Sequence, residues 1–149
     1  MSLARRSMIA LFLALPFAGA RAAPRTVKLR IASDGDEMAF KPDRLTCPSG
    51  TEVRVSFHHA GDVSSDPHDW VLLKPGTMKA FLADADKQTD DAVVVPAGDE
   101  GMVLAATPLC AKGKTVSVTF PAPPPGDYPF VCSVAGHGLS MHGILTVTA

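Results

Sequence analysis

A short loop near the C-terminal end of the chain holds three residues that can bind a metal ion. Cys132, His137 and Met141 lie within ten residues of one another, and strand-like apolar segments at 128–132 and 144–147 lead into and out of the loop. Thiolate, imidazole and thioether groups are soft nitrogen and sulfur ligands, which suit copper better than a hard cation. Strands on either side can hold such ligands in a fixed geometry. The pattern therefore predicts a β-protein with a copper site at the end of two strands.

Alternating apolar and polar residues predict further strands along the chain. The alternation is clearest at residues 27–31, 53–57 and 116–120, and shorter apolar runs predict strands at 45–47, 68–73, 102–106 and 128–132. One short helix is predicted at residues 78–87, with Thr77 as its N-terminal cap. About seven or eight short strands, separated by turn residues, predict an all-β fold, an antiparallel β-sandwich.

The first 22 residues have the pattern of a signal peptide. Arg5 and Arg6 precede an apolar run at 8–18, and Ala20-Arg21-Ala22 supplies small residues at the spacing that a signal peptidase reads. The run is too short to favour a membrane anchor. We expect residues 1–22 to be removed and residues 23–149 to form one exported, periplasmic domain that does not bind a membrane. General secretion and twin-arginine export both remain open.

Charge and cysteine content narrow the function further. Loss of three arginines with the signal peptide takes the formal charge from -1 to -4, and there is no basic stripe, so the mature domain is not expected to bind nucleic acid. Three cysteines in an exported protein suggest one disulfide and one thiol with another role. Because Cys132 lies in the ligand-bearing loop, Cys47 and Cys110 are the expected disulfide pair. The alternative is that both are buried free thiols.

A type 1 copper site requires a second histidine in addition to the loop residues, because its ligands are one Cys, two His and a weak axial Met. His68 is the best candidate among the five histidines, since it lies where a polar loop enters a strand that Trp70 anchors. Other site chemistries lack residues that they need. Structural zinc would favour a C-x-x-C pair, and a dinuclear copper centre would need a second Cys between Cys132 and His137. A Cys–His hydrolase would need an orienting acid and an oxyanion hole, which nothing in the sequence marks.

The chain resembles the azurins of the cupredoxin family from about residue 27 to residue 147. The most specific parts of the resemblance are C-S-V-A-G-H-G-L-S-M at 132–141 and H-D-W-V-L at 68–72. The resemblance implies a cupredoxin Greek-key β-sandwich of about eight strands with one short helical flap. It also implies one type 1 copper per chain, and its ligands would be His68, Cys132, His137, the axial Met141 and, weakly, the backbone carbonyl of Pro67.

Several residues near this site depart from the azurin pattern. Pro67 stands where azurins have Gly, and Asp69 stands where they have Asn, so the side chain at 69 can accept but not donate when it is ionised. Val134 and Ala135 replace a bulky aromatic residue and a Pro. Asp69 would lower the reduction potential, and an N–H bond from Ala135 to the Cys sulfur would raise it. His59 resembles a titrating histidine of the family, although it could equally be a hydrogen-bonded structural residue.

The resemblance implies that electrons pass through the exposed edge of His137, within an apolar patch formed by Met38, Val63, Val134 and Leu139. The expected function is that of a periplasmic one-electron carrier, not an enzyme, that cycles copper between Cu(I) and Cu(II). Its expected partners are redox proteins such as c-type cytochromes or periplasmic reductases, and we expect a monomer. The alternative is a periplasmic copper carrier or chaperone, which would favour an open Met/His cluster that the sequence lacks.

Overall fold

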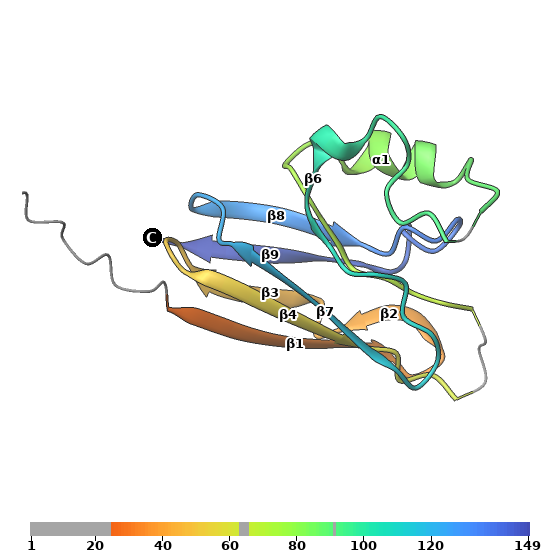
Figure 1. The fold of residues 1–149 in the computed structure, drawn as a ribbon, viewed down its shortest axis with the longest axis horizontal. Helices are drawn as coiled ribbons and strands as arrows, with labels where there is room; N and C mark the ends of the chain where they lie inside the picture. The colour runs from red at the N-terminus through yellow and green to blue at the C-terminus, as the bar shows by residue number, and fades with distance from the viewer. Residues whose placement is uncertain (1–24, 63–65, 91) are drawn as a thin grey trace, which may run out of the picture.

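The computed structural model describes residues 25–62, 66–90 and 92–149 of the 149-residue chain. The expected signal peptide and Val63 lie outside the described residues. Two β-sheets pack face to face, and one short helix covers the outer side of one sheet (Figure 1). No helix among the described residues is long and apolar enough to cross a membrane.

The first sheet has four strands and the second has five. The first follows the spatial order β2 (Glu37–Lys41), β1 (Thr26–Asp34), β4 (Glu52–His58) and β7 (Thr115–Pro121). The second follows the order β3 (Arg44–Pro48), β9 (His142–Thr148), β8 (Gly126–Val131), β5 (Val71–Leu73) and β6 (Val103–Ala106). The β-sandwich prediction is thus confirmed, with nine strands rather than about eight.

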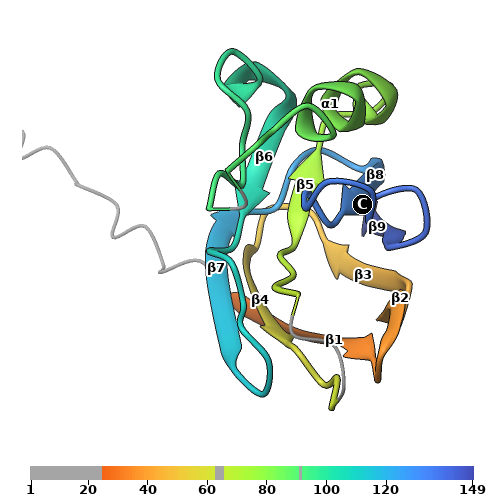
Figure 2. The ribbon, with the colours of Figure 1, turned by 90° about the vertical axis from the view of Figure 1, so that its right-hand side faces the viewer.

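The prediction of purely antiparallel sheets is wrong. β1 pairs with β4 in parallel, and β3 pairs with β9 in parallel, whereas the remaining strand pairs are antiparallel. The chain leaves the first sheet after β2, enters the second as β3, and returns to the first as β4. Such crossings let two strands of one sheet run in the same direction, which a hairpin connection cannot do. Figure 2 shows the two sheets in a view along the sandwich.

The interior between the sheets is built from alternate residues of each strand. Val53, Val55 and Phe57 of β4 are fully buried, while the residues between them are more exposed. An aromatic cluster joins the two sheets: the ring of Phe40 meets those of Phe57 and Phe130 at centroid distances of 5.6 and 5.4 Å. Edge-to-face contacts of this kind stabilise a core beyond simple burial, by about 0.5–1.5 kcal/mol each.

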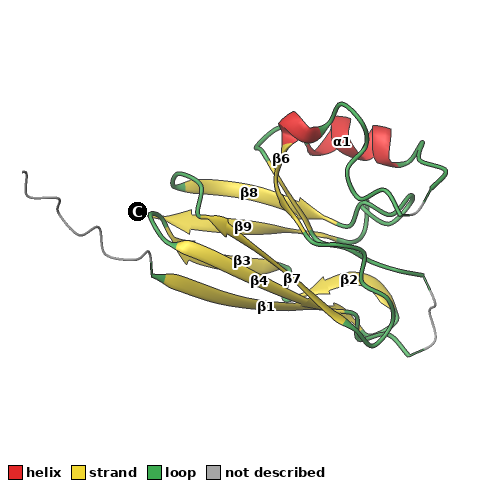
Figure 3. Ribbon diagram, in the orientation of Figure 1, coloured by secondary structure: helices red, strands yellow, loops and turns green. Residues whose placement is uncertain are grey.

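The helix α1 (Met78–Ala85) explains why β5 is apolar on both faces. Leu72 faces the core between the sheets, whereas Val71 and Leu73 pack with Phe81 and Leu82 beneath the helix. Figure 3 shows α1, in red, outside the five-stranded sheet. The helix ends two residues earlier than predicted, and Thr77 occupies the N-cap position without capping, since its hydroxyl donates to the Lys74 carbonyl at 2.8 Å. A short 3₁₀ helix, η1 (Glu100–Met102), precedes β6.

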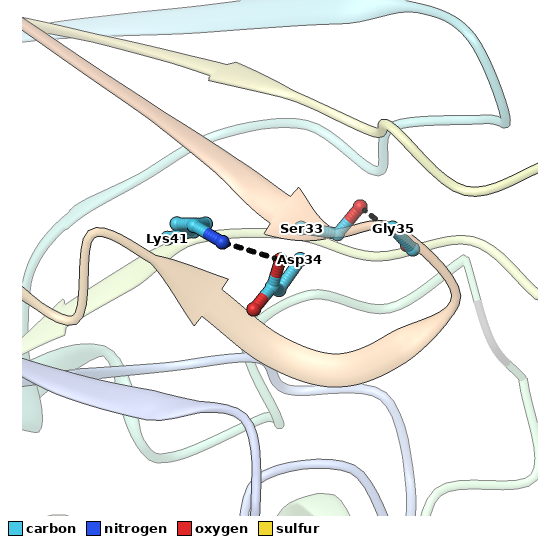
Figure 4. Close-up of polar contacts among 4 residues, drawn as sticks. All are labelled: Ser33, Asp34, Gly35 and Lys41. Carbon is cyan, nitrogen blue, oxygen red and sulfur yellow. Dashed lines mark hydrogen bonds and ion pairs between the residues drawn. The ribbon is translucent and has the colours of Figure 1, made fainter.

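The hairpin between β1 and β2 turns near the loop that follows β4. Lys41 Nζ lies 3.1 Å from Asp34 Oδ1, and the Ser33 hydroxyl donates to the Gly35 carbonyl at 3.3 Å (Figure 4). The ion pair is exposed, so its contribution to stability is at most about 1 kcal/mol. Ser33 Oγ also accepts from the Ala60 N–H at 2.8 Å, and this partly buried bond attaches the turn to the segment that follows β4.

The expected disulfide between Cys47 and Cys110 is not formed, and all three cysteines are free and buried. Cys47 lies opposite Val147, near the last residue of β9. Cys110 forms a backbone bridge with His68, at the end of the sandwich where β9 begins. Five residues of β9 separate these two ends, which is about 16 Å at 3.3 Å per residue. A disulfide needs Cα atoms within about 7 Å, so the two thiols cannot reach each other.

Candidate metal centre

Three buried side chains bring nitrogen and sulfur atoms together at the end of the sandwich where β9 begins. His68 Nδ1 lies 3.8 Å from Cys132 Sγ, and His137 Nδ1 lies 3.9 Å from the same sulfur. The two imidazole nitrogens lie 3.2 Å apart. All three ligand atoms therefore fit within 4.8 Å, as they must to bind one ion, and the donor set of two nitrogens and one thiolate sulfur fits copper.

Each of the three residues is held by a different part of the fold. His68 is tied into a backbone bridge with Cys110, with N···O distances of 3.1 and 2.7 Å. Cys132 follows the last residue of β8, which lies in the middle of the five-stranded sheet. His137 lies in the loop between β8 and β9. Residues that are 69 positions apart in the chain thus meet because β5, which follows His68, pairs with β8, which precedes the loop that carries His137.

Backbone hydrogen bonds close the loop around the site. The N–H of Cys132 donates to the Met141 carbonyl at 3.0 Å, and the N–H of Met141 donates to the His137 carbonyl at 2.8 Å. A further bond joins the His137 N–H to the Val134 carbonyl at 3.0 Å. Met141 is fully buried and belongs to the same apolar cluster as Cys132. The loop is therefore ordered by the protein's own contacts.

Burial favours the uncharged forms of Cys132 and His68 in the metal-free protein. Desolvation raises the pKa of the Cys132 thiol well above its ordinary value, and the nearby Asp69 raises it further. Burial also lowers the pKa of His68 to about 4, and the neighbouring His59 and His137 lower it as well. At neutral pH the site thus contains a thiol and a neutral imidazole. Cys132 must release its proton to become a ligand, so metal affinity is expected to rise with pH.

Asp69 links the segment that carries His68 to the segment that carries Cys132. Its carboxylate is fully buried and accepts two hydrogen bonds from Ser133, from the N–H at 2.7 Å and from the hydroxyl at 2.5 Å. Desolvation raises the pKa of Asp69 to about 6, although the two bonds from Ser133 act in the opposite direction. Ser133 is the donor in both hydrogen bonds, so the side chain at position 69 needs only to accept, and an ionised carboxylate can do so.

The other departures from the azurin pattern lie at the edge of the site. Pro67 is half-buried and immediately precedes His68, while Val134 is half-buried and Ala135 is exposed. Of the expected apolar patch, Leu139 is 75% exposed and Met38 is 47% exposed. Leu139 also lines an apolar hollow of about 550 Å³ against α1. Apolar surface beside Leu139 thus continues onto α1, which the sequence did not indicate.

His59 has a structural role. Its Nε2 lies 2.9 Å from the Asp66 carbonyl oxygen and donates to it, while its Nδ1 accepts from the Gly61 N–H at 3.2 Å. Both ring nitrogens are satisfied in the neutral form, and the residue is fully buried. The ring packs against His68 with a centroid distance of 4.5 Å. This places His59 behind the ligand, where it limits the orientations that His68 can adopt.

Sequence reasoning missed the contacts from α1 to the ligand loop. Asp86, the C-cap residue of the helix, accepts from the Gly136 N–H at 2.9 Å. Leu82 packs so closely against Gly138 that an added Cβ would overlap its Cδ2 atom. An apolar helix face predicts burial but does not reveal which distant loop it meets. In the sequence, only Gly136 and Gly138 could have indicated that another part of the chain approaches this loop closely.

Comparisons with known proteins agree with this geometry. Residues 26–148 match a family described as copper binding proteins of the plastocyanin/azurin family. Auracyanin-A of Chloroflexus aurantiacus is 35% identical over 122 residues, which cover 81% of this chain and 74% of that protein. An azurin of Methylobacillus flagellatus is 35% identical over 117 residues, covering 74% and 78%. The solved structure of auracyanin A, described as a blue copper protein, superimposes with a TM-score of 0.73 at 34% identity, covering 83% of this chain and 99% of the other.

Proposed function

Because the chain belongs to the plastocyanin/azurin family of copper-binding proteins, we propose that it carries single electrons between redox proteins of the periplasm. Blue copper proteins of this family, such as auracyanin and azurin, are electron carriers, and such proteins are generally not enzymes. His68, Cys132 and His137 would hold the copper, and Met141 and the Pro67 carbonyl would be weaker contacts. Bound copper would supply the one-electron step between Cu(II) and Cu(I).

The observation that carries this proposal is the preorganised, buried cluster of two imidazoles and one thiol. Cu(I) favours soft sulfur and Cu(II) favours nitrogen, and a mixed set held by the fold is a compromise between the two. The hydrogen bonds that Cys132 donates to Met141 and that Ser133 donates to Asp69 hold the ligand segments in place. A site whose ligands move little when the charge changes has a low barrier to electron transfer.

His137 is the proposed port for electrons. It is 8% exposed, against 3% for His68 and 0% for Cys132, so it is the most exposed residue of the three. The exposed Leu139, together with Val134, borders it on the same loop. When a partner protein covers a small apolar area around an imidazole edge, water leaves that area and no charged group has to be buried. Such a surface suits short-lived complexes with several different partners.

Location and partners are proposed on chemical grounds. The N-terminal pattern supports export to the periplasm. There the chain would exchange electrons with c-type cytochromes or periplasmic reductases. Asp66 lies in the segment beside the site and is exposed, so a partner with a basic rim around its own cofactor would be favoured.

The test is the spectrum and redox behaviour of the copper-loaded protein. We expect one copper per chain, an intense visible band from thiolate bound to Cu(II), and reversible one-electron cycling. Cys132→Ser should remove the band, whereas Cys47→Ser, the matched control at another buried cysteine, should leave it unchanged. Met141→Leu should shift the reduction potential while copper stays bound. A colourless protein that readily yields its copper to a chelator would refute the electron carrier and favour a copper carrier.

A further inference from the structure

Helix α1 contacts the ligand loop on both sides of His137. On one side, the Gly136 N–H donates to Asp86 Oδ1 at 2.9 Å. On the other side, Gly138 lies between Leu82 and the Cys132 carbonyl: a Cβ added there would lie 2.9 Å from that oxygen and overlap the Leu82 side chain. The two chain neighbours of a proposed copper ligand are thus both held by the last half of the helix.

Asp86 is well placed to act as a fixed anchor. Its own N–H donates to the Leu82 carbonyl at 2.9 Å, so its backbone continues the hydrogen bonding of the helix. Leu82 is 6% exposed and belongs to the apolar cluster that joins α1 to β5 and β8. The bond to Gly136 therefore connects the loop to the five-stranded sheet through a packed element rather than through another loop.

His137 lies farther along the chain from a strand than Cys132 does, since five residues separate it from the end of β8 and four from the start of β9. The backbone bonds of His137 link it to Val134, Ser140 and Met141, which are all in the same loop. His68 has a bridge to another segment, and Cys132 adjoins a central strand. The base of the loop is fixed by the bond from the Cys132 N–H to the Met141 carbonyl and by the pairing of Val131 with His142. The bond from Gly136 to Asp86 adds a contact between the middle of the loop and another element.

We propose that Asp86 is a positioning residue for the electron port: by accepting from Gly136 it holds the His137 imidazole in place, so that this ligand moves little when the metal changes oxidation state. This rests on the proposed function. The role belongs to the hydrogen bond rather than to the negative charge, because the acceptor atom contacts the loop directly. An amide oxygen at the same position should therefore serve equally well.

Three variants separate the bond from the charge. Asp86→Ala removes both, and Asp86→Asn removes the charge but keeps an acceptor oxygen. Asp84→Ala is the matched control: it removes a carboxylate of the same helix that pairs with Lys87 at 2.7 Å and makes no recorded bond to the described loop residues.

The first readout needs no metal. Amide hydrogen exchange at Gly136 in the metal-free protein should become faster in Asp86→Ala, by up to about tenfold, which corresponds to the loss of one hydrogen bond. Asp86→Asn and Asp84→Ala should exchange at close to the wild-type rate. Equal exchange in all four proteins would overturn the anchoring contact.

The second readout is the electron self-exchange rate of the copper-loaded protein. It should be measured at high ionic strength, where differences in surface charge are largely screened. Asp86→Ala should be severalfold slower than Asp86→Asn, which should match wild type. Equal rates for the two Asp86 variants would overturn the positioning role even if Gly136 exchange changed. A wild-type protein that cannot cycle reversibly would refute the proposed function, while the Gly136 data would still decide whether Asp86 holds the loop.

Discussion

Replacement of Gly143 by alanine adds a single methyl group, and we expect it to lower the stability of the folded protein considerably. Gly143 lies in β9, two residues after Met141, and pairs with Phe130 of β8. A Cβ at this position would overlap the Asp43 carbonyl oxygen and lie 2.5 Å from Cε2 of the Phe130 ring. The same stretch of backbone is held by the Ile144 N–H, which donates to the Asp43 carbonyl at 2.9 Å.

The magnitude follows from how little these neighbours can move. Ordinary contact begins at 3.4 Å, so Cβ and Phe130 Cε2 would have to separate by 0.9 Å. Phe130 is fully buried and packs against Phe40 and Trp70, and the other clash is with backbone. Overpacking of this kind costs roughly 1–3 kcal/mol. For a domain of this size, that corresponds to a fall in Tm of about 4–12 °C.

The assay is urea and thermal unfolding of the metal-free Gly143→Ala protein. Gly101→Ala is the matched control, because a Cβ at Gly101 meets nothing within 4 Å and its φ is not in the left-handed region. The control should be neutral or more stable by up to about 1 kcal/mol, through the reduced entropy of the unfolded chain. If Gly143→Ala unfolds within about 0.5 kcal/mol of both wild type and control, the argument from close packing at this position is refuted.

Three further predictions test other features. The metal-free protein unfolded without reductant should have three reactive thiols per chain, and a single thiol would mean that Cys47 and Cys110 are bridged after all. Trp70, the only tryptophan, is fully buried and its Nε1 has no partner among the described residues, so its fluorescence in the metal-free protein should be strongly blue-shifted and poorly quenched by iodide. A solvent-like emission maximum before unfolding would contradict that burial. Because the folded state raises the pKa of Asp69 to about 6, ionisation of Asp69 destabilises the folded protein, and wild type should lose stability relative to Asp69→Asn as the pH rises from about 4 to 6. The loss should be about 1.4 kcal/mol per pH unit and should level off above pH 6. The measurement is urea unfolding of both metal-free proteins across this pH range. A stability difference that does not vary with pH would show that Asp69 is not desolvated as described.

Much of the strand content could be predicted because a half-buried strand has a local signature. Residues 53–57 and 116–120 alternate in the sequence, and they lie within β4 and β7 as predicted. The predicted strand at 68–73 shortened to residues 71–73, since His68 leaves the sheet to make its own bridge with Cys110. The apolar residues 70–73 are buried as expected, but an apolar run indicates burial on both faces of a strand and does not give the length of the strand.

Which strands are neighbours could not be read from these local patterns. Alternation shows that one side of a strand is buried, but it does not show its partner or its direction, and the parallel pairs β1–β4 and β3–β9 were missed for this reason. The disulfide prediction failed in the same way. The number of cysteines suggested a bridge between Cys47 and Cys110. The register of the strand pairs places these two residues at opposite ends of the sandwich.

The sequence by itself determined the chemistry of the candidate site. Cys132, His137 and Met141 lie so close in the chain that one loop must bring them together, and soft ligands of these types favour copper whatever the surrounding fold. Only the tertiary structure decided what holds them: the carboxylate of Asp69 on Ser133, and Asp86 on the loop beside His137. These contacts join residues 50 or more positions apart, and they exist because β5 pairs with β8 and α1 packs on the same sheet. No local pattern encodes that arrangement.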